Sequence, residues 1–216
     1  MRAFPSAMTA HESQLATLLD RAPAEAVREP TAREAIGRAV VELVEALRHH
    51  HTGTAEHSNR LAAQCRLVGE ALDLAADVVF ELELVAILHD IGKLAVPTDI
   101  LDLARPLNSR ERSVVCSHTI RGAEILAQVA GLAHLAPLVR SSHERWDGTG
   151  YPDRLAGPRI PLHARVVFTV DAYDAMTNDR PYRRALEQAE ARRRIAAASG
   201  SAFDPGVVRA LLAAVP

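Results

Sequence analysis

The feature that most constrains the fold is apolar side chains repeated at helical spacing, with no convincing segment that alternates as a β-strand does. Between residues 31 and 50, one helical stripe carries Ile36, Val40, Leu43, Val44 and Leu47. Further helical patterns occupy residues 54–70, 77–90, 109–129, 135–145, 162–178, 185–198 and 206–214. The sequence therefore predicts an all-α protein.

Local signals mark the ends of several of these helices. Asn108 stands three residues before Glu111, which is the spacing of a capping box, and Thr31 stands in the same relation to Glu34. Residues 204–205 read Asp-Pro, which is typical of an N-cap followed by proline in the first turn.

Residues 1–30 carry three prolines around a short amphipathic piece. We predict an N-terminal extension over 1–30 and one main domain over 31–216.

Charge and composition exclude several classes of function. The formal net charge is −2 and the isoelectric point is near 6.6, so there is no general attraction to nucleic-acid polymers or to an anionic membrane. No segment approaches 18 uncharged apolar residues, so we expect no membrane span. Cys65 and Cys116 match no zinc or redox spacing and are expected to be reduced, buried thiols of a cytoplasmic protein.

Histidine dominates the polar chemistry, with 10 residues in the chain. Asp90 follows VAILH and Asp171 follows VVFTV, so both carboxylates leave apolar helix faces, where an unpaired charge costs several kcal/mol. A metal ion, a histidine or an arginine would each satisfy them, and mixed imidazole and carboxylate ligands suit Fe, Mn or Zn. His134 and His163 are expected to be ordinary polar residues.

Six motifs identify the chain more specifically: TAEHSNRLA, LHDIGKLAVP, SHTIRGAEIL, SHERWDGTGYP, VDAYDAMTNDRPYR and FDP. In this order and spacing, from about Thr52 to the C-terminus, they resemble the HD-GYP family. This is the branch of the HD metal-dependent phosphohydrolases that cleaves the bacterial second messenger cyclic di-GMP. The resemblance implies an HD-domain helical bundle with a GYP loop, here residues 147–161, between two helices.

The same resemblance assigns roles to individual residues. The positions that match metal ligands are His57, His89, Asp90, His118, His143 and Asp171. Asp90 would bridge two divalent ions, with Fe or Mn favoured, and such a site activates water for in-line attack on a phosphodiester. Lys93, the one lysine among 25 basic residues, would act with Asp90 in catalysis, because its compact ammonium can reach a phosphate oxygen.

Other positions are expected to bind substrate or to support the site. Tyr151 would stack on a guanine or simply close the GYP loop, and Arg180 and Arg183 would bind phosphate. Glu144 and Asp147 are expected to orient His143 or the loop rather than to bind metal.

Two positions depart from the family pattern. Ser142 stands where the family usually has a histidine ligand, and a serine hydroxyl is a poor ligand, so one metal should bind more weakly. Gly53 stands where some members have a glutamate that binds a third ion, so three metals are not expected.

Three functions remain open on the sequence. The leading one is a metal-dependent phosphodiesterase that opens cyclic di-GMP to linear pGpG, with further hydrolysis to GMP left open. A second is an HD phosphohydrolase for another nucleotide. A third, favoured by Ser142, is a metal-poor module that binds cyclic di-GMP or a partner such as a diguanylate cyclase domain or another signalling protein.

Overall fold

The computed structural model of this 216-residue chain describes residues 30–51, 54–179 and 184–215, apart from the side chains of residues 30–33 and 54–56. The longer helices are α2 (Pro30–His50), α3 (Thr54–Ala71), α4 (Ala76–Leu88), α7 (His118–Ala127), α9 (Leu162–Thr177), α10 (Gln188–Ala197) and α11 (Pro205–Ala214). Shorter elements are η1 (Ile91–Ala95), α5 (Thr98–Leu101), α6 (Ser109–Cys116), η2 (Ala133–Leu135), α8 (Ala136–Arg140) and η3 (Gly157–Arg159).

Over these described ranges, β-pairing is confined to one isolated bridge between Ser199 and Phe203, and no strand is present. The prediction of an all-α fold is therefore confirmed. Each described helix is also too short or too polar to cross a membrane.

The capping signals agree with the structure at two of the three predicted sites. The Asn108 side chain accepts a hydrogen bond from the backbone of Glu111, and the reciprocal bond completes a capping box at α6. Asp204 caps α11 by accepting from the backbone N–H groups of residues 206 and 207, with proline in the first turn. At the third site, α2 begins at Pro30, one residue before the predicted cap Thr31, so that boundary was wrong.

Two predicted helices differ from those observed, in both cases beside serine. The pattern over 109–129 divides into α6 and α7 at Ser117, whose hydroxyl donates to the Val114 carbonyl at 2.7 Å. The helix expected over 135–145 ends at Arg140, where the Ser141 hydroxyl donates to the Pro137 carbonyl at 3.0 Å. Such side-chain bonds compete with the helical backbone pattern. Residues 141–145 are consequently not helical, and His143 lies in a turn.

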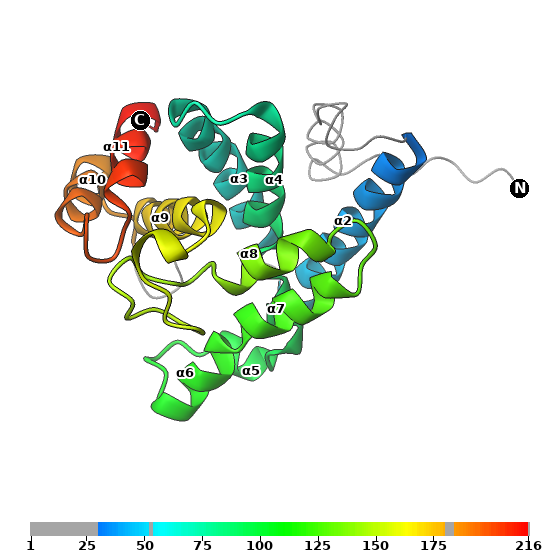
Figure 1. Cartoon of the computed structure of the whole chain (residues 1–216). Helices are drawn as coiled ribbons and strands as arrows, with labels where there is room; N and C mark the ends of the chain where they lie inside the picture. Colours follow the sequence, from blue (N-terminus) through cyan, green and yellow to red (C-terminus); the bar gives the residue numbers. More distant parts are fainter. Residues whose placement is uncertain (1–29, 52–53, 180–183, 216) are drawn as a thin grey trace, which may run out of the picture.

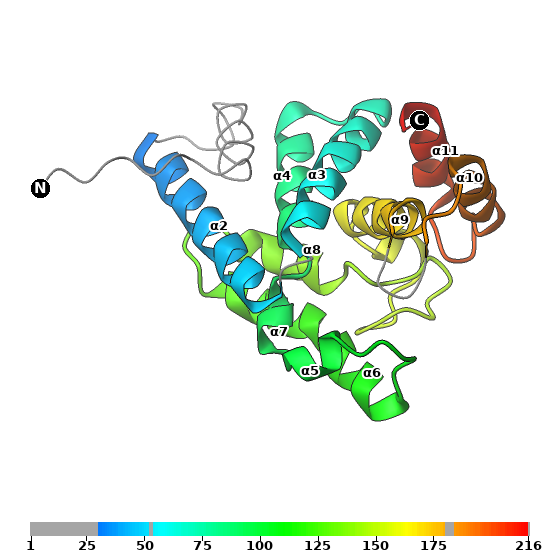
Figure 2. The same ribbon diagram turned by 180° about the vertical axis from the view of Figure 1, so that it is seen from behind.

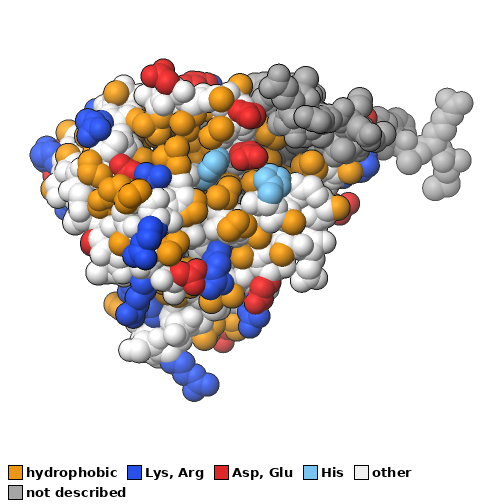
Figure 3. Space-filling view, in the orientation of Figure 1, with side chains coloured by type: hydrophobic (Ala, Val, Ile, Leu, Met, Phe, Trp, Pro, Cys, Tyr) orange, Lys and Arg blue, Asp and Glu red, His pale blue; other side chains and the backbone are white. Residues whose placement is uncertain are grey.

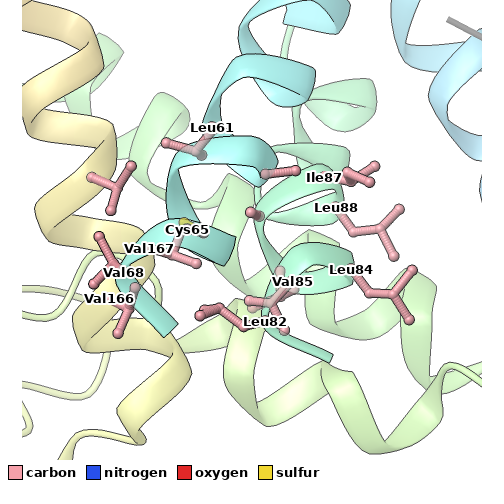
Figure 4. Packing of buried hydrophobic residues seen from close by; sticks show 14 of the residues in the cluster. Leu61, Cys65, Val68, Leu82, Leu84, Val85, Ile87, Leu88, Val166 and Val167 are labelled. Atoms are coloured by element: carbon pink, nitrogen blue, oxygen red, sulfur yellow. The ribbon is translucent and has the colours of Figure 1, made fainter. Parts of the chain in front are cut away.

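The core forms where α3, α4 and α9 meet. In Figure 4, Leu61, Cys65 and Val68 of α3 lie between the leucine and valine side chains of α4 and those of α9. The α4 residues labelled there are Leu82, Leu84, Val85, Ile87 and Leu88, and those of α9 are Val166 and Val167. Because α4 is buried over most of its length, it is fixed by neighbours on several sides.

The remaining helices surround this core on three sides. Figures 1 and 2 show α10 and α11 beside α9, α2 at the opposite side, and α5 and α6 at the lower end next to α7. The C-terminal end of α4 points from the core toward η1 and α7, which brings the segment after α4 to the middle of the molecule.

Close packing of η1 against α7 depends on Gly92. A Cβ atom at this position would lie 1.8 Å from the His118 carbonyl oxygen and 2.4 Å from the Gly122 backbone nitrogen. A residue without a side chain is therefore required, and the resulting contact sets the distance between Asp90 and His118.

Candidate metal centre

The six side chains expected to bind metal come from five different parts of the fold and meet in one place. They are His57 of α3, His89 and Asp90 after α4, His118 at the start of α7, His143 in the turn after α8, and Asp171 of α9. They form two groups, His57–His89–Asp171 and Asp90–His118–His143. Within each group, one ligand atom from every residue lies within 4.8 Å of the others.

Asp90 lies between the two groups. Its Oδ2 atom is 3.4 Å from Nε2 of His89, which belongs to the first group, and its Oδ1 atom is 3.5 Å from Nε2 of His118 in the second. Lys93 approaches from η1, with its ammonium nitrogen 2.5 Å from Oδ2. The two oxygens of one buried carboxylate thus face different sets of imidazoles.

Three of the histidines are held in place by contacts of their Nδ1 atoms. His89 donates to the Ala86 carbonyl at 2.8 Å, and His118 donates to the Val115 carbonyl at 2.7 Å. The Nδ1 atom of His57 lies 2.7 Å from Oδ2 of Asp174. Such bonds fix the ring orientation and tautomer of metal-binding histidines and leave Nε2 available as the ligand atom.

The burial and bonding of two candidate donor atoms also fit a metal site. Nε2 of His118 and Nε2 of His143 are both inaccessible to solvent, and within the described ranges neither has a hydrogen-bond partner. Buried polar atoms are normally satisfied, so two unsatisfied imidazole nitrogens beside a carboxylate need an explanation. Imidazole and carboxylate groups in this arrangement suit divalent transition metals such as Fe, Mn and Zn.

Electrostatics keep both aspartates in the charged form that a metal ligand needs. Burial opposes the charge on Asp90, but His89, Lys93 and His118 hold the pKa of its carboxyl well below the usual range. Burial likewise opposes charge on Asp171, and His57, through a hydrogen bond, leads the groups that lower its pKa. Both aspartates are therefore carboxylates at neutral pH.

The histidines divide into two classes. Burial lowers the pKa of His118, and burial together with the nearby His118 lowers the pKa of His143 to about 3, so both rings are neutral. Burial also opposes charge on His57, but hydrogen bonds to Asp171 and Asp174 outweigh it and raise the pKa of His57 to about 9. A metal ion at this ring would have to displace its proton.

Asp174 is a site residue that the sequence reasoning missed. Its side chain is fully buried, and besides His57 it binds Nε of Arg60 at 3.1 Å and Nδ2 of Asn178 at 2.9 Å. The signal was present in the sequence, because Asp174 follows Asp171 by three residues and therefore lies on the same face of α9. Asp174 contacts Nδ1 of His57, whereas Asp171 lies near the other ring nitrogen, with its Oδ1 atom 3.1 Å from Nε2 of His57.

The GYP loop folds back onto the segment that carries His143. A Cβ atom on Gly150 would lie 2.3 Å from the Arg145 backbone nitrogen, so only glycine permits this approach. The Tyr151 backbone donates to the His143 carbonyl at 3.2 Å, and the two rings stack with centroids 5.3 Å apart and planes 11° apart. Burial and contact with Cys116 raise the pKa of the Tyr151 hydroxyl.

The two supporting acids contact the loop rather than the ligand groups. Glu144 is buried, and its Oε1 atom accepts from the Asp153 backbone at 2.7 Å, which ties the loop to the turn after α8. Asp147 lies at the start of the loop and accepts hydrogen bonds from Arg145, just before the loop, and from Thr149 within it. Those hydrogen bonds, led by the one from Arg145, lower its pKa.

Ser142 is buried beside His143, and its hydroxyl has no hydrogen-bond partner within the described parts of the chain. The expected substrate residues Arg180 and Arg183 lie outside the described residues, as does Gly53. Cys65 and Cys116 are both free thiols; Cys65 is buried as expected, but Cys116 is only partly buried, so that expectation was wrong for Cys116.

Known proteins match most of the chain. The HD domain family matches residues 42–207. The chain is 37% identical over 187 residues to the cyclic di-GMP phosphodiesterase response regulator RpfG of Xanthomonas campestris, covering 83% of this chain and 47% of that protein. It is 38% identical over 208 residues to a cyclic di-GMP phosphodiesterase of Pseudomonas aeruginosa, covering 96% of this chain and 47% of the relative. The chain thus spans about half the length of these relatives.

Solved structures support the same fold. An HD-GYP-type protein, Bd1817 from Bdellovibrio bacteriovorus, superposes with a TM-score of 0.62 at 15% identity, covering 96% of this chain and 73% of that one. A cyclic GMP-AMP specific phosphodiesterase of Vibrio cholerae also gives 0.62 at 20% identity, covering 81% of this chain and 47% of that one. With its ordered motifs and its helical bundle, the chain belongs to the HD-domain family, in the HD-GYP branch.

Proposed function

We propose that this protein is a metal-dependent phosphodiesterase that hydrolyses cyclic di-GMP to linear pGpG by attack of water on a phosphodiester. The observation that carries the proposal is the pair of three-residue ligand groups that meet at Asp90. The named activities of the Xanthomonas and Pseudomonas relatives support the choice of substrate.

Two ions would be held by this chain's own residues. His57, His89 and Asp171 would hold one ion, and His118 and His143 would hold the other, with Asp90 as the shared ligand. When bound, such ions supply Lewis-acid stabilisation of phosphate charge and lower the pKa of water. Fe or Mn remains the favoured identity, since imidazole and carboxylate ligands suit both.

The neighbouring side chains would bind and orient the substrate. Lys93 already lies against Asp90, and its ammonium would neutralise a nonbridging phosphate oxygen there. Tyr151 has one ring face against His143, so a guanine would have to meet another part of that ring. Arg180 and Arg183 remain proposed phosphate ligands. Glu144 would keep the GYP loop in place through Asp153.

A second candidate function rests on Ser142. Its buried hydroxyl stands where the family usually has an imidazole ligand, so one ion would be held by fewer protein ligands. In that case the protein would be a metal-poor module that binds cyclic di-GMP or a signalling partner such as a diguanylate cyclase domain. The location proposed for either function is the cytoplasm.

A second candidate substrate is 3'3'-cGAMP. Relatives from Vibrio cholerae are named 3'3'-cGAMP-specific phosphodiesterases, one of them 39% identical over 134 residues. A hybrid cyclic dinucleotide has the same phosphodiester chemistry, so the ligand groups alone do not distinguish the two.

The decisive experiment measures metal content and turnover on the same preparation. The protein would be purified without oxygen and loaded with Fe(II) or Mn(II). It would then be incubated with cyclic di-GMP or 3'3'-cGAMP, and the products separated by chromatography. Near two ions per chain with release of pGpG is the expected result. Tight binding of intact cyclic di-GMP with little metal and no product would favour the binding module instead.

A further inference from the structure

His143 differs from the other candidate histidine ligands in how its ring is held. Contacts of Nδ1 hold the three rings described above, but within the described ranges the ring of His143 has no such hydrogen bond, and its Nε2 atom is unsatisfied. Its ring instead stacks on Tyr151, with centroids 5.3 Å apart, and meets the edge of Phe168 at 6.2 Å. The orientation of this imidazole therefore depends on whatever holds those two neighbouring rings.

Both neighbours lead to the turn between α10 and α11, residues 198–204. The Phe168 ring packs on Phe203 of this turn, with centroids 5.4 Å apart. The GYP loop, which carries Tyr151, is anchored to the same turn where the loop begins. There the backbone N–H groups of residues 146 and 147 donate to the carbonyls of residues 202 and 201, at 3.0 and 2.8 Å.

Arg165, the fourth residue of α9, joins this turn to both ends of the loop. Its Nη1 atom donates to Oδ2 of Asp204 at 2.6 Å, and its Nε atom donates to the Ile160 carbonyl, near the end of the loop, at 2.9 Å. Its guanidinium also lies over the ring of Trp146, directly before the loop, 5.8 Å from the centroid. Arg165 precedes Phe168 by three residues, so the two side chains share one face of α9.

Burial makes this contact a firm one. Figure 3 shows Lys and Arg side chains spread over the surface of the molecule, whereas the side chain of Arg165 is 19% exposed and that of Asp204 is 10% exposed. In a buried pair, each charge depends on its partner, because removal of one leaves the other unpaired. Asp204 is fixed at both oxygens, since its Oδ1 atom caps α11 while Oδ2 accepts from Arg165.

We propose that Arg165 and Asp204 are positioning residues for His143. Their ion pair fixes the GYP loop and the Phe168 ring, and these orient the imidazole as Nδ1 hydrogen bonds orient the other candidate ligands. The proposal rests on the proposed function in one respect, that His143 is a metal ligand. Loss of the pair should loosen the ion held by the Asp90–His118–His143 group and leave the other group unchanged.

Two substitutions in the full-length chain break the pair in different ways. In Arg165→Lys the charge is kept, but a single ammonium cannot replace a planar fork that donates to two separate oxygens. In Asp204→Asn the helix cap is kept, because asparagine caps as well as aspartate, so this variant should fold. Its amide nitrogen would stand where Arg165 needs an acceptor. Arg192→Lys is the matched control, because Arg192 of α10 likewise donates to two carbonyls, at the far end of α11 from the loop.

Two measurements separate positioning from simple stability. NMR spectra of the metal-free protein report on the His143 ring, because the parallel Tyr151 ring displaces its signals, and His143→Gln identifies them. Calorimetric titration with Mn(II) gives the affinity of each ion. Trp146 is the one tryptophan in the chain, so its fluorescence reports directly whether the guanidinium still lies over its ring.

Arg165→Lys and Asp204→Asn should each move the His143 signals toward those of an unstacked imidazole. Each should also weaken one Mn(II) ion about 10–100-fold, the usual effect of losing a residue that orients a ligand. The double variant should be little worse than either single one, because both break the same interaction, and Arg192→Lys should match wild type.

A lower melting temperature with His143 signals and Mn(II) affinities equal to those of Arg192→Lys would show that the pair only stabilises the fold, and would overturn the proposal. Failure of the proposed function is a separate result. A wild-type protein without phosphodiesterase activity, or with little metal, would still show or lack the change in the His143 signals, because the NMR comparison needs neither metal nor substrate.

Discussion

Replacing Gly92 by alanine is the sharpest test of how the fold builds the candidate metal centre. The new Cβ atom would lie 1.8 Å from the His118 carbonyl oxygen and 2.4 Å from the Gly122 nitrogen. Both obstructing atoms belong to the backbone of α7, so rotation of a side chain cannot relieve the contact. Separation to 3.0 Å, which is still very tight, requires η1 and α7 to move apart by 1.2 Å (3.0 minus 1.8).

This movement has a cost in stability and a cost in geometry. Overpacking of this kind costs typically 1–3 kcal/mol, and we expect about 3 kcal/mol because backbone must move. For a chain of this length, that corresponds to a fall in melting temperature of roughly 6–12 °C. The same displacement would separate Asp90 from His118, now 3.5 Å apart, so metal loading should fall as well.

Gly69→Ala is a suitable control for the loss of a glycine in itself. Its Cβ atom would meet the side-chain tips of Leu82 and Val79 at 3.2 Å, and such tips can shift by a few tenths of an ångström. Differential scanning calorimetry and metal analysis would be carried out on both variants and on wild type. If Gly92→Ala melted within 2 °C of Gly69→Ala and bound as much metal as wild type, the packing of η1 on α7 would not control the centre.

Four further substitutions test individual residues. Asp90→Ala should abolish hydrolysis and release both ions, and a full metal complement in that variant would contradict the shared-ligand assignment. Lys93→Arg should fold but lose most turnover, because a planar guanidinium cannot take the place of an ammonium 2.5 Å from Asp90; wild-type turnover would argue against a role for the ammonium. Ser142→His should tighten binding of the more weakly held ion, measured as metal stoichiometry. Unchanged stoichiometry with unchanged or lower turnover would favour the binding module. Asp174→Asn should lower the pKa of His57 from about 9 in metal-free protein, because one of its two carboxylate partners is removed, and an unchanged NMR titration of that ring would refute this.

The sequence by itself determined the helical class and most helix boundaries. These are local properties, since apolar periodicity and capping at residues such as Asn108 depend on neighbours a few positions away. The ordered motifs also selected the six side chains that the structure brings together. The division of the chain at residue 31, the roles of the site residues and the metal identity stay predictions.

Only the tertiary structure decided how those side chains are arranged. His143 was expected within a helix, but α8 ends at Arg140 and places it in a turn, where the GYP loop stacks Tyr151 against it. The division of the candidate ligands into two groups depends on the packing of α4 against α9 and on the approach of η1 to α7 at Gly92. Such distances join residues that are far apart in the chain, and close packing of the whole core sets them, so no local pattern in the sequence contains them.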